Sequence, residues 1–245
     1  VATDAVTVGA RAASVGSLVD VTRPVEIRTP WHPDIAHPLP LDFADVRGNT
    51  DALPLLLEAA RRRHPVVLVG PPGCGKTMLA ARLPGLLGPL TSAEAIEVAA
   101  VQDAAGLHAP GSLDLGRVGR PFRAPHHTVS VPGLLGDALL RPGEASLAHH
   151  GVLLLDEFPE FPRASRAALR TVVQGEVVVR RSGRPMRFPA DLWLVVATNP
   201  CPCGWAGTAR CRCPEEVVSR YTARWRDDPL LRDAVVIRLR GVGRE

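Results

Sequence analysis

The chain has 245 residues, of which 46% are hydrophobic, and this is enough for one α/β domain with a sizeable core. No apolar run approaches the ~20 residues that span a bilayer, and the N-terminus lacks the basic-then-apolar order of a signal peptide. We therefore expect a cytoplasmic protein with no membrane partner. The formal net charge is +4, too small an excess to indicate a polyanion-binding protein unless the basic residues cluster.

Residues 1–40 show no sustained hydrophobic periodicity. Five prolines fall between Pro24 and Pro40, and this density predicts a linker or the remnant of an N-terminal domain. Regular structure is expected from Leu41 onwards, so residues 41–245 are expected to form one folded core.

The first predicted elements of that core are a helix over Leu53–Arg63 and a β-branched strand over Val66–Val69. A second helix is expected from Lys76 to about Leu83, where Pro84-Gly85 stops it. Thr91-Ser92-Ala93-Glu94 is a capping box, and it predicts a third helix reaching about Ala105.

Residues 106–150 are rich in Gly, Pro and His, and so long an irregular stretch indicates an inserted functional loop. The elements expected after it are buried strands at Val152–Leu155 and Leu192–Ala197, a helix over Ala164–Gln174, and a hairpin of Val177–Arg181 and Arg184–Phe188. Buried strands that alternate with helices predict a parallel sheet covered on both faces.

The segment Gly70–Thr77 fits the pattern G-x-x-x-x-G-K-[ST], directly after a strand and at the start of a helix. Such a loop turns its backbone N–H groups towards phosphate oxygens, while the lysine reaches the β/γ-phosphates and the hydroxyl ligates Mg²⁺. Lys76 is the chain's single lysine, against 28 arginines. The alternative is a glycine-rich turn without a ligand. The residues expected at the nucleotide are Gly70, Pro71, Pro72, Gly73, Cys74, Gly75, Lys76, Thr77 and Met78.

Two carboxylates, Asp156 and Glu157, follow the strand Val152–Leu155. At the carboxyl end of a parallel strand, Asp156 is placed to hold Mg²⁺ and Glu157 to polarise an attacking water. Capping of the next helix is the alternative.

Asn199 follows the strand Leu192–Ala197, where its amide could orient the same water. Here the alternative is a plain turn at Asn199-Pro200.

Four of the five cysteines form a cluster, Cys201-Pro-Cys203 and Cys211-Arg-Cys213. Four thiolates suit tetrahedral zinc, although C-x-C is tighter than the usual spacing. Free thiols or a redox pair are the alternative.

Three stretches together resemble one family, the magnesium-chelatase-like AAA+ ATPases of the YifB/ComM group. They are Gly70–Leu90, the pair Pro121–Ser130 with Arg141–Phe161, and Asn199–Gly204 with Cys211–Cys213. The chain is similar, more distantly, to the ATPase subunit of magnesium chelatase. The resemblance covers about residues 41–224. It implies a P-loop AAA+ core that binds ATP and Mg²⁺, and rings, usually hexamers, with ATP sites between subunits. For the ComM branch it implies DNA branch migration.

The resemblance also carries roles onto single positions. Gly73, Gly75, Lys76 and Thr77 match the Walker A residues, Asp156 and Glu157 match Walker B, and Asn199 matches sensor 1. Lys76, Glu157 and Asn199 are thus the expected catalytic residues. Asp45-Val46-Arg47-Gly48 resembles the segment along the adenine, so Val46 and Gly48 join the expected nucleotide contacts. The pairs His126-His127 and His149-His150 belong to the family's signature, and structural hydrogen bonding is their favoured interpretation over a metal site.

The sequence departs from the family at three places. Where the family reads Leu-Leu-Asp-Arg, and its arginine acts in a neighbour's site, this chain has Leu230-Leu231-Arg232-Asp233. The family's C-terminal helical lid is expected to be absent, and so is most of its N-terminal domain. Efficient hydrolysis by this chain alone therefore does not follow from the resemblance.

Arginines cluster in the predicted hairpin, around the turn Ser182-Gly183. A protruding arginine-tipped hairpin suits contact with a phosphate backbone, and the alternative is a solvated surface hairpin. The candidate DNA contacts are Arg180, Arg181, Arg184 and Arg187.

The sequence thus predicts a Mg-ATP-driven motor subunit acting on DNA. The rival hypotheses are a chelatase-type motor acting on a protein partner, and a nucleotide-binding chain with little turnover.

Overall fold

The computed structural model of the chain describes residues 43–44, 46–107, 115, 118–137, 139, 141–172, 175–181 and 184–241. The predicted linker over residues 1–40, Asp45 and the turn Ser182-Gly183 lie outside them. In this part of the chain, no helix combines the length and the apolar character that crossing a membrane requires.

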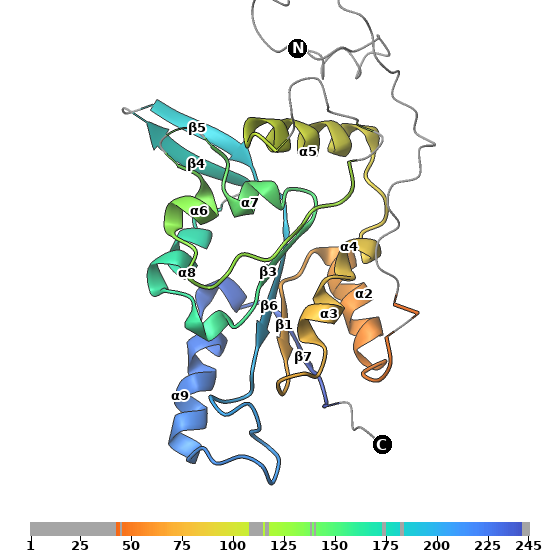
Figure 1. Cartoon of the computed structure of the whole chain (residues 1–245), viewed down its shortest axis with the longest axis vertical. Coiled ribbons are helices and arrows are strands. Elements are labelled where there is room, and N and C mark those ends of the chain that lie inside the picture. The colour runs from red at the N-terminus through yellow and green to blue at the C-terminus, as the bar shows by residue number, and fades with distance from the viewer. Residues whose placement is uncertain are drawn as a thin grey trace, which may run out of the picture.

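A five-stranded parallel sheet forms the centre of the domain (Figure 1). Its strands, in spatial order, are β2 (Phe122–Arg123), β3 (Val152–Leu155), β6 (Trp193–Thr198), β1 (Val66–Val69) and β7 (Val235–Arg238). Because β1 and β3 both pair with β6, the segments that follow these three strands meet at one edge of the sheet.

Both faces of the sheet are buried, which is why its central strands β3, β6 and β1 are buried at every position and almost wholly apolar. Along β1, Val66 and Leu68 enter one core and Val67 and Val69 enter the other, and β3 and β6 alternate in the same way. The predicted parallel sheet with two covered faces is therefore confirmed.

Helices cover the two faces unequally (Figure 1). One core is closed by α2 (Ala52–Arg62), α3 (Lys76–Ala80) and α4 (Leu83–Leu86). The other is closed by α6 (Val131–Leu135), α7 (Glu144–Leu147), α8 (Arg163–Leu169), α9 (Glu215–Arg226) and the 3₁₀ turns η3 (Phe158–Glu160) and η4 (Pro229–Leu231).

Helix α5 (Ser92–Ala104) begins at the predicted capping box. The Thr91 hydroxyl accepts from the backbone N–H of Glu94, and the Glu94 carboxylate accepts from the N–H of Thr91. Both halves of the box are thus present, and the predicted start of this helix is confirmed.

Several elements differ from the sequence-based expectation. The predicted helix Lys76–Leu83 breaks after Ala80, and Pro84-Gly85 lies inside α4 instead of ending a helix, because proline is tolerated in a first turn. The predicted helix to Gln174 ends at Leu169. Residues 106–150, expected to be irregular, contain β2, α6 and α7, while α9 and β7 were not predicted.

The predicted hairpin is confirmed as β4 (Glu176–Arg181) and β5 (Arg184–Pro189), an antiparallel pair separate from the main sheet. Val177 and Val179 pack on the core beneath α6 and α7, so this face fixes the hairpin to the domain. Val178, Arg180 and Arg187 alternate with them and are exposed.

Candidate nucleotide site

The predicted phosphate loop, residues 70–77, joins the end of β1 to the start of α3. A Cβ atom on Gly70 would lie 2.6 Å from Cys74 Sγ and 3.0 Å from the carbonyl oxygen of Leu239. The loop therefore closes tightly on itself and against the end of β7, and a residue larger than glycine would open it. Buried Cys74 supplies packing at this point.

The Lys76 ammonium lies at the centre of the loop. It donates to the carbonyl oxygens of Gly70 (2.8 Å) and Pro71 (3.1 Å) and to the side-chain oxygen of Asn199 (3.0 Å). Asn199 comes directly after β6, the strand beside β1, so the two predicted site residues meet across neighbouring strands. The result is a fixed cation at the point where the glycine loop turns into a helix.

Thr77 meets the first of the two carboxylates at the same edge. Its hydroxyl donates to Asp156 Oδ2 at 2.7 Å, and Asp156 Oδ1 accepts from the backbone N–H of Glu157 at 2.9 Å. A hydroxyl and a carboxylate side by side are the hard oxygen donors that Mg²⁺ prefers. The residues present therefore fit the magnesium ion that the sequence predicts.

The backbone of Glu157 is in the left-handed region, with φ 54°. Its carboxylate is 60% exposed, and its Oε2 lies 3.4 Å from Nδ1 of His127. His127 contacts its neighbour His126, with ring centroids 4.0 Å apart, and His126 Nδ1 lies 2.8 Å from the Thr128 hydroxyl. This pair of histidines therefore lies beside the predicted catalytic carboxylate.

A cavity of about 250 Å³ opens next to the phosphate loop. It lies between the segment 46–49 and the loop, and the Asn49 side chain closes it by bonding Arg240 through both Nδ2 (3.1 Å) and Oδ1 (2.7 Å). The predicted adenine segment is thus brought to the phosphate loop. The residues that line the cavity include Val46, Gly48, Gly73, Gly75, Met78 and Leu239.

A second hollow, of about 510 Å³, lies on the other side of the predicted catalytic residues. Glu157 and Asn199 line it together with Arg220, Tyr221 and Arg224 of α9. Burial raises the pKa of Tyr221, whose hydroxyl interacts with Thr198 at the end of β6. Arg224 is one of the two arginines, with Arg226, that the sequence offers in place of the exchanged Arg232, whereas Arg220 and Tyr221 were not predicted. The available signal was the i, i+3 spacing of Tyr221 and the i, i+4 spacing of Arg220 from Arg224, which puts each of them beside Arg224 on a helix.

The second histidine pair is a hydrogen-bonding cluster. Nε2 of His149 and Nε2 of His150 lie 2.9 Å and 2.7 Å from the same oxygen, Oε2 of Glu97. His149 Nδ1 accepts from the backbone N–H of Asp191 at 3.0 Å, so its proton is on Nε2 and is donated to Glu97. A metal ion at these residues would need the Nε2 lone pair, so the geometry favours structural hydrogen bonding.

The exchanged pair Arg232-Asp233 follows η4 and is exposed. The carbonyl oxygen of Asp233 lies 3.4 Å from His64 Nδ1, next to the start of β1. The nearby Asp228 is instead buried, and it accepts from Arg166 of α8 (2.9 Å) and from Arg170, directly after α8 (2.8 Å). This ion-pair group holds α9 and η4 against α8.

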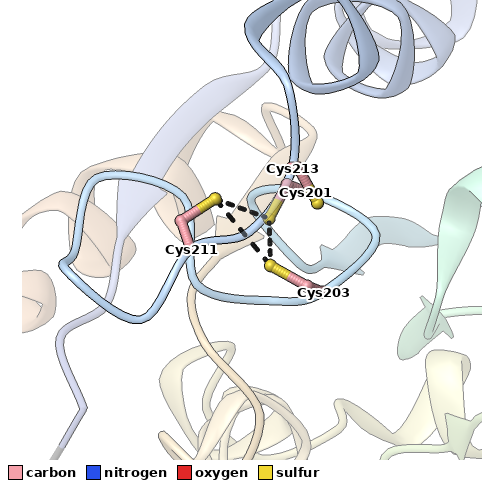
Figure 2. Close-up of side chains that lie close together, drawn as sticks. All are labelled: Cys201, Cys203, Cys211 and Cys213. Carbon is pink, nitrogen blue, oxygen red and sulfur yellow. Dashed lines mark hydrogen bonds between the residues drawn. The ribbon is translucent and has the colours of Figure 1, made fainter.

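The four clustered cysteines converge in the loop between β6 and α9, as Figure 2 shows. Cys201 Sγ lies 3.3 Å from that of Cys203 and 3.9 Å from that of Cys211, and Cys203 and Cys211 are 3.8 Å apart. All four sulfurs lie within 4.8 Å of one another. Tetrahedral zinc with Zn–S bonds of about 2.3 Å places its sulfurs about 3.8 Å apart. The donor set and its spacing therefore fit one zinc ion.

The same cluster distributes charge unevenly among its thiols. Backbone hydrogen bonds from Arg212 and Trp205 lower the pKa of Cys203 to about 6. The backbone of Cys203 in turn acts to lower the pKa of Cys213, but the neighbouring sulfurs of Cys203 and Cys201 and partial burial outweigh this and raise it to about 11. One thiolate thus raises the pKa of the next thiol, and a bound cation would lower the pKa of both.

The arginines of the hairpin are only partly available to a polyanion. Arg187 Nη1 donates to Glu176 Oε2 at 2.8 Å across the hairpin, whereas Arg180 is exposed on the same face. The side chains of Arg181 and Arg184 lie outside the described part of the structure. Arg180 is therefore the described arginine whose role in DNA binding can be tested most directly.

A phosphate loop after the first strand, paired carboxylates after β3 and a polar residue after β6 define an α/β P-loop domain of the AAA+ kind. The chain belongs to the family described as "Magnesium chelatase, subunit ChlI", whose model matches residues 42–241, and within it to the YifB/ComM group.

Three relatives match this chain over most of its length. The competence protein ComM of Haemophilus influenzae is 44% identical over 191 residues, covering 75% of this chain and 36% of that protein. YifB of Escherichia coli is 40% identical over 192 residues (78% and 37%), and an uncharacterised protein of Mycobacterium tuberculosis is 43% identical over 201 residues (81% and 39%). The chain thus spans less than two fifths of the length of these relatives.

Among solved structures, NtrX of Brucella abortus in complex with ATP aligns with a TM-score of 0.46 and 19% identity. The alignment covers 81% of this chain and 38% of that one. A likeness of this extent does not carry that protein's ligand over to this chain.

Proposed function

We propose that this chain is the nucleotide-binding domain of an ATP-driven motor that remodels DNA. The observation that carries the proposal is the convergence of Lys76, Thr77, Asp156 and Asn199 at the carboxyl ends of three adjacent strands, with contacts of 2.7–3.0 Å. The predicted phosphate cation, the two magnesium donors and the water-orienting amide all lie at this edge.

In this proposal the phosphate loop and Lys76 bind the phosphates, and the cavity beside Val46 and Gly48 takes the adenine. Thr77 and Asp156 would hold Mg²⁺, which when bound neutralises charge on the phosphates. Glu157 polarises the attacking water, and Asn199 orients it. The exposure of Glu157 towards the hollow shared with α9 supports this role, because the carboxylate is accessible to water there.

The assembly that we propose is a ring of identical subunits, as is usual in the AAA+ class. The partner that we propose is DNA, held by the exposed face of the β4–β5 hairpin. Support comes from family membership, from the name of the competence relative and from the exposed Arg180. A chelatase-type motor that acts on a protein partner is the competing function, since the family also includes the chelatase subunit.

Salt-dependent DNA binding separates these two functions. We expect binding to single-stranded and duplex DNA to weaken steeply with salt, and Arg180→Ala to reduce the slope of log K against log salt by about 0.7–0.9 for one lost phosphate contact. Arg62→Ala is the matched control, because Arg62 is exposed on α2 and pairs with Glu58 on its own helix. Absence of salt-dependent DNA binding in wild type would favour the protein partner.

We also propose that Cys201, Cys203, Cys211 and Cys213 bind one zinc ion per chain. Sulfur spacings of 3.3–3.9 Å and the absence of any disulfide among the described cysteines support it. Metal analysis of protein purified without chelator tests it, with about one zinc per chain as the expected result. A zinc-free and fully folded protein would contradict it.

A further inference from the structure

The cysteine loop, residues 200–214, connects the two elements that frame the candidate nucleotide site. It begins directly after Asn199, whose amide oxygen accepts from Lys76, and it ends at Pro214, before α9. Cys201, the first ligand candidate, is fully buried two residues after Asn199. Any movement of the cysteine loop is therefore transmitted over a very short distance to a residue that contacts the phosphate loop.

The cysteine loop also contacts the phosphate loop directly. A Cβ atom on Gly204 would lie 2.5 Å from Cδ and 2.7 Å from Cγ of Pro72. These distances are shorter than side chains tolerate, so the backbone at Gly204 rests against the proline ring. Pro72 belongs to the turn that shapes the loop around Lys76. The cysteine loop therefore contacts the phosphate loop at Gly204, and Asn199, directly before the loop, contacts it through Lys76.

The shape of the cysteine loop is maintained by local contacts and by its sulfurs. The backbone hydrogen bonds Gly204 to Cys201, Thr208 to Trp205 and Cys211 to Thr208 each span three residues. Cys201 Sγ accepts from the backbone N–H of Ala206 at 3.2 Å, and Arg210 stacks over Trp205 at 5.0 Å. The sulfur cluster is the contact that joins the first part of the loop, at Cys201 and Cys203, to the last part, at Cys211 and Cys213.

We propose that metal binding at the cysteine cluster holds Gly204 against Pro72 and Asn199 against Lys76, so that nucleotide affinity depends on the metal. The inference rests on the zinc site and the nucleotide binding proposed above. It adds a mechanical link between them: the metal does not touch the nucleotide but positions the loop that supports the phosphate site. Gly204 and Pro72 are positioning residues in this account.

A matched pair of glycines isolates the link. Gly204 and Gly207 lie in the same loop and have the same left-handed backbone, with φ +84° for each. A Cβ on Gly207 would meet nothing within 4 Å, whereas a Cβ on Gly204 meets Pro72. Alanine therefore imposes the same backbone strain at both positions, and only at Gly204 does it also push on the phosphate loop.

The experiment measures two quantities on the full chain: zinc content, and the dissociation constant of a fluorescent ATP analogue with Mg²⁺. We expect Gly204→Ala to retain zinc but bind the analogue about tenfold more weakly, and Gly207→Ala to bind like wild type. Removal of zinc from wild type with a chelator should weaken binding by a similar factor, and added zinc should restore it. If Gly204→Ala fails to fold, this removal and restoration remains the test.

A compensating variant tests the contact itself. Pro72→Ala removes the Cγ and Cδ atoms that a Cβ at Gly204 would meet. The double variant Gly204→Ala, Pro72→Ala should therefore bind the analogue more tightly than Gly204→Ala alone. Equal weakening by Gly204→Ala and Gly207→Ala, with zinc and wild-type binding both present, would overturn the link while leaving both sites in place. Wild type without zinc but with full nucleotide binding would overturn the metal site, and wild type with zinc but no nucleotide binding would overturn the proposed function.

Discussion

The Thr77 hydroxyl donates to a carboxylate oxygen of Asp156 at 2.7 Å, although 79 residues separate the two along the chain. The contact exists because β1 and β3 both flank β6, so that the turns after β1 and β3 face each other across one strand. Two oxygen donors suited to Mg²⁺ are thereby set beside Lys76.

Replacing Glu157 by Gln should leave binding of Mg-ATP intact and slow hydrolysis by about 10²-fold or more, because an amide does not polarise water as a carboxylate does. Single-turnover hydrolysis and analogue affinity measure the two effects separately. Glu160→Gln is the matched control, since Glu160 lines the same hollow three residues later. Equal turnover by wild type and Glu157→Gln would remove Glu157 from the mechanism.

Exchanging Arg232 and Asp233 should raise ATP turnover in concentrated protein. An arginine that acts in a neighbour's ATP site raises the rate of hydrolysis by ~10³-fold or more. A shift of one residue turns the Arg232 side chain by about 100° around a helical segment. We therefore expect weak activity from wild type and at least about tenfold more from the variant Arg232→Asp, Asp233→Arg. Arg232→Ala should change little. Brisk, concentration-dependent turnover by wild type would instead direct attention to Arg224, which lines the hollow beside Glu157 and Asn199.

The parts of this fold that local patterns specify could be predicted. The strands Val66–Val69 and Val152–Leu155 are short apolar runs bounded by turn residues, and the capping box at Thr91 is a four-residue signal. Strand β7 was not predicted because it lies at the edge of the sheet, where Val236 and Arg238 are exposed and Ile237 is the buried residue of its four. Its register with β1 is set by the tertiary structure.

The candidate site shows the same division. The phosphate loop is one unbroken segment of the sequence and the carboxylate pair is another, so each was predicted as a unit. The approach of Asn199 to Lys76, the place of Arg224 and the contact of Gly204 with Pro72 depend on how separate segments pack. Local spacing indicates which residues of α9 neighbour one another, but it does not encode which other segments they pack against.

Replacing Asp228 by Ala should destabilise the domain by about 3–5 kcal/mol, because it leaves Arg166 buried without its partner. For a domain of this size the loss corresponds to roughly 6–20 °C in Tm. Asp227→Ala is the neighbouring control, because Asp227 is exposed, and it should change the free energy of unfolding by less than about 0.5 kcal/mol. Similar Tm values for the two variants would mean that the ion-pair group does not stabilise the α8–α9 contact.

The free energy of unfolding should decrease as the pH falls below about 6.5. Burial, above all, lowers the pKa of His149, so below its unfolded value of about 6.5 the unfolded chain binds more protons than the folded one. Hydrogen bonds from His149 and His150 lower the pKa of Glu97 as well, which extends the loss to more acidic pH. One such group contributes at most about 1.4 kcal/mol per pH unit. Tm measured from pH 7.5 to 5 should fall more for wild type than for His149→Gln, and parallel curves would contradict this.

The central claim, that this edge of the sheet is a working Mg-ATP site, is tested most directly by ATP turnover with and without DNA. The assay is run over a range of protein concentrations that allows assembly, with Lys76→Ala beside wild type and Arg62→Ala as the charge control. We expect wild type to bind Mg-ATP and to turn it over slowly, with an increase when DNA is added. Lys76→Ala should lose binding by about 10-fold to 100-fold or more, because a charged hydrogen-bond donor is removed. Unchanged affinity of Lys76→Ala for ATP would contradict the claim.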